Sequence, residues 1–153
     1  MAMPHEVYLT LRLLHLVFMA GWLAAGLSAP SDIRRTLALG RPHVDALVPR
    51  AQRSIKITQG AGYLTVLTGV GLIFAQGGFA FVAPRIHAGF ALALVALAIE
   101  AVLAEPAWRR IKKEIEGGGD LKEALASARR FSMAFGIGHL LRFVILVLMV
   151  FRF

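Results

Sequence analysis

The sequence predicts an all-α fold, an integral membrane four-helix bundle that forms a single domain over residues 1–153. Composition is the first observation: the chain is 58% hydrophobic, whereas soluble domains average about 45–50%. The second is that the apolar residues gather in four blocks, at about 7–29, 57–75, 86–104 and 131–152. Each block is close to the roughly 20 residues that a helix needs to cross the bilayer hydrocarbon.

The basic residues predict how the chain crosses the membrane. Thirteen of the seventeen Lys and Arg residues lie in two connections, 34–56 and 109–130, while the connection between the second and third blocks carries only Arg85. The positive-inside rule therefore places both basic loops in the cytoplasm and both termini outside. The net charge of +8 is therefore explained by the orientation of the chain in the membrane and by attraction to lipid. A nucleic-acid partner is not needed to explain it.

The first block is expected to be a permanent span rather than a cleaved signal peptide, because no basic segment precedes it. Pro30 is expected to end that helix, and a short amphipathic helix is expected to follow and to end at Gly40. Pro49 is then expected to break or kink the chain before the second span. The chain has no cysteine, which excludes disulfides and thiolate chemistry.

The second block carries small or slim residues on one helical face, where they favour close helix packing or a smooth wall beside a flat cofactor. They are Thr58, Gly62, Thr65, Gly69 and Leu72. The third block is expected to continue as a helix beyond Pro106, until Gly117–Gly119 breaks it. Asp120 is expected to begin a new helix with a capping box that runs into the fourth block, so the last two spans form a long hairpin with a cytoplasmic tip.

Ionisable side chains inside the four blocks mark candidate sites, because a charge within a membrane is costly. They are His15, His87, Glu100, His139 and Arg142. Helix rise, counted from the outer boundary, places His15, His87 and Arg142 in the outer half and pairs Glu100 with His139 in the inner half. Glu100 projects from nearly the opposite side of its helix to His87.

Helical spacing groups further residues with the two outer histidines. Those on the face of His15 are Tyr8, Arg12, Met19, Trp22 and Gly26. Those on the face of His87 are Ala91, Leu94, Ala98 and Ala101.

Three interpretations of the polar residues stay open. Two histidines on facing helices of a bundle hold haem b, so His15 and His87 are candidate ligands to the haem iron, with Arg142 beside a propionate. A structural network is the second interpretation, with His15 bonded to Thr65 or Tyr63. In that network Glu100, His139 and Arg142 would form a buried ionic cluster that fixes helix register. Metal or proton transport is the third. Soluble-enzyme motifs are absent from the sequence, so catalytic residues stay unknown and an enzymatic role stays open.

The pattern resembles small four-span bacterial membrane proteins, a group that includes the HemJ-type protoporphyrinogen oxidases and the membrane domain of copper-resistance D-type proteins. The resemblance rests on LRLLHLVFMAGWLAAGLSAP with His15, on YLTVLTGVGLIF, and on RIHAGFALAL with His87. It implies haem b between the first and third spans, with His15 as ligand, in a bacterial inner membrane. HemJ-type enzymes carry a Lys early in the third span, where this chain has Ala88, Gly89 and Phe90.

The leading hypothesis is therefore a membrane protein that binds haem b for electron transfer or tetrapyrrole handling. The alternative is a non-enzymatic accessory or scaffold subunit, in contact with membrane protein partners or with copies of itself. Its contact surfaces would be the hairpin 108–130 and the connector 31–56. The third hypothesis is a small metal or ion transporter that depends on Glu100.

Overall fold

The computed structural model describes residues 4–151, and throughout that range the chain is helical, without strands. In chain order the elements are α1 (His5–Ala25), α2 (Ala29–Leu39), η1 (His43–Ala46), α3 (Leu47–Ala75), η2 (Phe79–Phe81), α4 (Pro84–Ile99), η3 (Glu100–Ala104), α5 (Glu105–Glu116) and α6 (Leu121–Val150). They make up four long helical segments, each long and apolar enough to cross a membrane. The predicted number and type of spans is confirmed.

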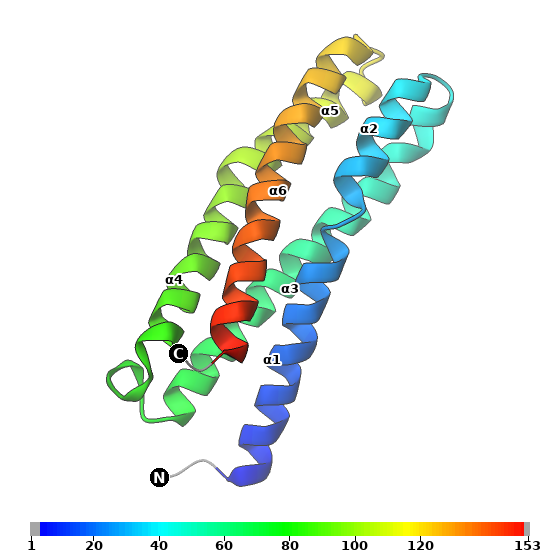
Figure 1. Ribbon diagram of the computed structural model, residues 1–153. Helices are drawn as coiled ribbons and strands as arrows, with labels where there is room; N and C mark the ends of the chain where they lie inside the picture. Colours follow the sequence, from blue (N-terminus) through cyan, green and yellow to red (C-terminus); the bar gives the residue numbers. More distant parts are fainter. Residues whose placement is uncertain (1–3, 152–153) are drawn as a thin grey trace.

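Two helical hairpins lie side by side (Figure 1). In the first, α1 packs along α3, and in the second, α4 packs along α6. The hairpins touch each other far less, and α1 scarcely contacts α6. The space between them therefore stays partly open toward the end of the molecule that holds the Gly77-Gly78 turn.

Proline acts differently from the prediction at two of the helix boundaries. The first helix ends at Ala25, and Pro30 lies in the first turn of α2 instead of stopping α1. Likewise α3 begins at Leu47, so Pro49 lies in its first turn and does not break it. Proline is tolerated in a first turn because its missing N–H would have no helical partner there. The predicted end at Gly40 is confirmed, with φ at 72°.

The third span continues beyond the membrane-length block, as predicted, but through a π-helical turn. This turn, η3, covers Glu100–Ala104 and comes just before Pro106 in α5. Proline lacks an N–H and its ring crowds the carbonyl four residues earlier, so the local ladder widens instead of breaking. α5 then ends at Glu116, with Gly117 as its C-cap. Asp120 caps α6 by accepting a hydrogen bond from the backbone N–H of Lys122, at 2.8 Å.

The two basic connections pack against each other and form what we call the basic head, made of α2, η1, α5 and the adjoining ends of α3 and α6. Its core includes Ile33, Leu37, Val44, Leu47, Trp108, Ile111, Ile115 and Phe131. The Trp108 indole N–H donates to Gln52 Oε1 at 2.8 Å, and Arg41 donates to the Ile115 carbonyl at 2.9 Å. The hairpin 108–130 and the connector 31–56, which were predicted to contact partner proteins, therefore bury much of their apolar surface against each other.

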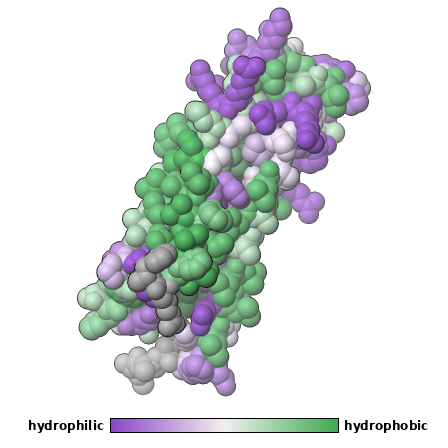
Figure 2. Space-filling view, viewed as in Figure 1, coloured by the Kyte–Doolittle hydropathy of each residue, from purple (hydrophilic) through white to green (hydrophobic). Residues whose placement is uncertain are grey.

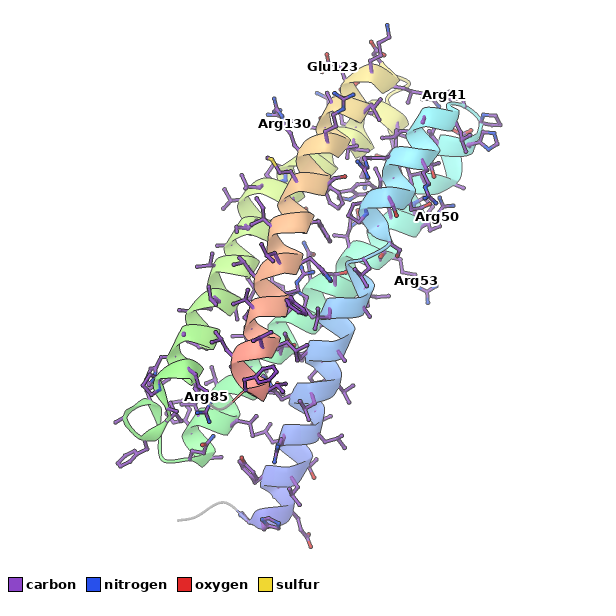
Figure 3. The ribbon with its side chains drawn as sticks, in the orientation of Figure 1. Arg41, Arg50, Arg53, Arg85, Glu123 and Arg130 are labelled. Atoms are coloured by element: carbon purple, nitrogen blue, oxygen red, sulfur yellow. The ribbon has the colours of Figure 1, made fainter. Side chains whose placement is uncertain are left out.

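Hydropathy divides the surface along the long axis. Figure 2 shows a broad apolar band over the helices and a polar cap over the basic head. Figure 3 shows Arg41, Arg50, Arg53 and Arg130 at that head, with Arg85 at the opposite end. Each span exposes large apolar side chains over the band, including Leu13, Leu67, Leu94 and Leu140. A soluble fold would bury such residues, whereas a bilayer solvates them.

Replacing Ile111 by alanine is expected to lower the free energy of unfolding by about 2–5 kcal/mol, because a fully buried side chain leaves a cavity. Leu39→Ala is the matched control in the same head, since Leu39 is 65% exposed, and a change within about 0.5 kcal/mol is expected. Thermal unfolding of both variants in detergent, followed by circular dichroism, measures the difference. Equal losses in the two variants would contradict this description of the head core.

Candidate functional site

A cavity of about 480 Å³ lies between the two hairpins, in the half of the molecule away from the basic head. One face of α1 lines it with Tyr8, Arg12, His15, Leu16, Met19 and Trp22. Five of the six residues predicted to share this face therefore line the cavity, and the sixth, Gly26, does not. Most of the other lining residues are apolar, and they come from α3, α4 and α6.

His15 is held against α3 by one ring nitrogen. Its Nδ1 lies 3.0 Å from the Thr65 carbonyl oxygen and 3.1 Å from the Thr68 hydroxyl. The Thr68 hydroxyl donates a hydrogen bond to the Leu64 carbonyl oxygen at 2.7 Å, so toward His15 it acts as an acceptor. Gly69 permits the approach, because a Cβ there would lie 3.2 Å from His15 Cε1.

This contact sets the tautomer of His15. A carbonyl oxygen only accepts, so Nδ1 carries the proton and donates it to Thr65. In the neutral ring Nε2 is then the unprotonated nitrogen. Among the residues that the structure describes, none makes a hydrogen bond to His15 Nε2. The half-buried ring therefore offers a lone pair beside the cavity.

Polar groups also gather at the mouth of the cavity, away from the basic head. Arg12 and Tyr8 come from the first turns of α1, and Gln76 comes from the end of α3. Arg12 is exposed. An anionic group on a ligand would find its charge partner there.

The structure does not bring His87 together with His15. His87 is exposed and lies beside the Phe79 ring, with 6.0 Å between the ring centroids. Ala91, Leu94, Ala98 and Ala101, which were predicted to share its face, are exposed as well. The cavity is instead lined by Ile86, Gly89, Phe90 and Ala93 of α4. The face of α4 that carries His87 points away from the bundle.

A buried ion pair lies next to Trp22, one of the residues that line the cavity. Glu100 accepts a hydrogen bond from Arg142, and both side chains are almost completely buried. The Trp22 indole N–H donates to the same carboxylate oxygen at 3.3 Å. The Arg142 guanidinium lies over the Trp22 ring, 4.9 Å from its centroid. Trp22 thus lines the cavity and also contacts the ion pair.

This pairing differs from the two groups predicted from depth, but it agrees with the structural-network interpretation, which placed Glu100 and Arg142 in one buried ionic cluster. Arg142 does not line the cavity, and Glu100 binds Arg142 directly. His139 Nδ1 is buried without a hydrogen-bond partner in the described part of the chain. The depths predicted from helix rise were wrong for this pair, because they assumed that all four spans begin at the same outer boundary. Glu100 lies sixteen residues from the start of α4, but Arg142 lies eight residues from the end of α6.

The end of α6 must therefore lie about 12 Å deeper than the start of α4, at 1.5 Å per residue. Figure 1 agrees, since α6 stops short of the ends of α1 and α3. Further cavity or contact residues that we did not predict are Thr68, Gln76 and Met149. Helical spacing was the one available signal: Gln76 follows Leu72 by four residues, and Met149 follows Arg142 by seven.

Bare metal ions need several side-chain ligands, and residues 4–151 contain no group of three or more His, Asp or Glu side chains placed to hold one. Comparison with protein-family models, with curated proteins and with solved structures finds no match for this chain. The structure itself defines the class: an all-helical, multi-pass membrane protein with a ligand-sized cavity between two hairpins.

Gly62 is expected to be intolerant of alanine, because a Cβ there would lie 2.9 Å from the rigid Trp22 ring. Gly62→Ala should lower the free energy of unfolding by about 1–3 kcal/mol through overpacking. Gly60→Ala is the matched control on the same helix, since a Cβ at position 60 meets nothing within 4 Å. Denaturation in mixed micelles compares the two, and a loss at Gly60 as large as at Gly62 would contradict the packing.

Arg142→Met and Glu100→Gln are each expected to lower the free energy of unfolding by about 3–5 kcal/mol, because each leaves a buried polar group or charge without its partner. The double variant should lose less than the two losses added together. Arg50→Ala provides the control, because the Arg50–Asp32 pair is partly exposed and is worth about 0.2–1 kcal/mol. Strict additivity of the two buried substitutions would show that the side chains do not interact.

Proposed function

We propose that this protein binds haem b in the cavity between its hairpins, with His15 as an iron ligand. The observation that carries the proposal is the geometry of His15: the ring is fixed by Nδ1 and leaves Nε2 unprotonated beside a largely apolar cavity. Metal-ligating histidines characteristically donate their other N–H to a carbonyl or carboxylate, which fixes the ring and raises its basicity. Thr65 supplies that carbonyl here.

The remaining cavity residues suit the same group. The volume of the cavity, about 480 Å³, falls within the range of roughly 300–1,000 Å³ that is typical of small-molecule and cofactor sites. Arg12 at the mouth is the cation available to a propionate, a role for which Arg142 is unsuited because Glu100 already neutralises it.

Haem, when bound, would supply one-electron redox chemistry, and its porphyrin would supply the equatorial ligands to the iron. The chain would contribute the axial ligand His15, an apolar environment and an anion partner. The resemblance to four-span bacterial proteins points to the same cofactor and to a bacterial inner membrane. Both basic loops would then face the cytoplasm, and the mouth of the cavity would face outward. The Lys expected of HemJ-type enzymes is absent, so oxidation of protoporphyrinogen is not part of the proposal.

Protein expressed with ample haem and purified in mild detergent is expected to show a Soret band at a stoichiometry near one haem per chain. His15→Ala should abolish most of that band because it removes the iron ligand. His87→Ala is the matched control, since His87 is exposed on the other face of α4, and it should leave the band unchanged. A wild-type protein without a Soret band, or a band unaffected by His15→Ala, would leave His15 as a helix-packing contact only.

A further inference from the structure

The wall of the cavity that faces His15 carries one side chain able to ligate iron. That wall is formed by α4 and α6, and its lining residues are Ile86, Gly89, Phe90, Ala93, Ile145, Leu146, Met149 and Val150. Only the thioether of Met149 among them offers a ligand atom, because the others are glycine or hydrocarbon side chains. Thioether sulfur is a recognised axial ligand of haem iron, usually opposite a histidine.

The position of Met149 is set by the surrounding structure. Met149 follows Arg142 by two helical turns on the same face of α6, and the Glu100–Arg142 pair sets the level of that face. Gly89 of α4 leaves space for the terminal methyl of Met149, since a Cβ at position 89 would collide with it. The side chain is 38% exposed, so it is not locked in a packed core, and its unbranched shape can adapt to a ligand.

Met19 also lines the cavity but cannot take the same role. It lies on α1, one turn from His15 on the same wall, and it is only 6% exposed. A flat ligand bound between the hairpins would have His15 on one side, so a second iron ligand would have to come from the other hairpin. Met149 meets this condition and Met19 does not.

We infer that Met149 Sδ is the second axial ligand, across the cavity from His15, of the haem proposed above. The inference rests on that proposed function and narrows it. With both axial positions filled by protein, the iron keeps no open position for oxygen or substrate. Histidine–methionine ligation also raises the reduction potential relative to sites without methionine. The cavity then suits an electron carrier rather than an oxygen-handling enzyme.

The experiment compares reconstituted wild type with Met149→Leu, a substitution that conserves volume and removes the sulfur. Met149→Leu is expected to retain haem, to show a lower midpoint potential, and to bind carbon monoxide in the ferrous form, which wild type should not do. Met133→Leu is the control and should behave as wild type. Met133 lies on α6, 61% exposed.

Met149→His guards against a simple loss of packing, because it restores a ligand of different chemistry. It is expected to retain haem and to exclude carbon monoxide, with a potential below that of wild type. A wild-type Soret band that depends on His15, together with an unchanged potential and no carbon monoxide binding in Met149→Leu, would overturn the role of Met149 alone. Absence of the band in wild type would overturn the proposed function as well.

Discussion

The contact among Glu100, Arg142 and Trp22 is the interaction on which the rest of the membrane region depends. Desolvation makes a buried ion pair costly, and removal of one partner would leave the other charge uncompensated in an apolar medium. Here the pair joins the two helices of the second hairpin, and the Trp22 N–H joins it to the first hairpin. That pair fixes the depth of α6 relative to α4, and its contact with Trp22 lies beside the cavity.

Small residues let this contact form. A Cβ at Gly26 would lie 2.7 Å from the Arg142 guanidinium, and one at Gly62 would lie 2.9 Å from Trp22. In lipid, where no hydrophobic force drives helices together, such close approach is a main source of association. The hairpins therefore meet at Trp22 and in the basic head, while the opposite half stays apart. The cavity and His15 lie in that gap.

Much of the fold was predictable because its causes are local. Hydropathy and block length predicted the spans, and Gly40, Gly117 and Asp120 mark helix ends that depend on residues nearby in the chain. The face of α1 with His15 was predictable because its polar residues contrast with its apolar sides. The face of α4 was not: lipid is as apolar as a helix interface, so small and aliphatic residues on both sides leave the buried face undetermined.

The sequence by itself determined the all-helical class, the four spans, the basic connections and the shared face of His15 and Trp22, because periodicity, hydropathy and charge act over short stretches of chain. Only the tertiary structure decided that Glu100 pairs with Arg142, that His87 faces away from His15, and that Met149 lies across the cavity. These facts depend on the relative depth and rotation of whole helices. Packing between distant segments sets both quantities, and no local pattern records them.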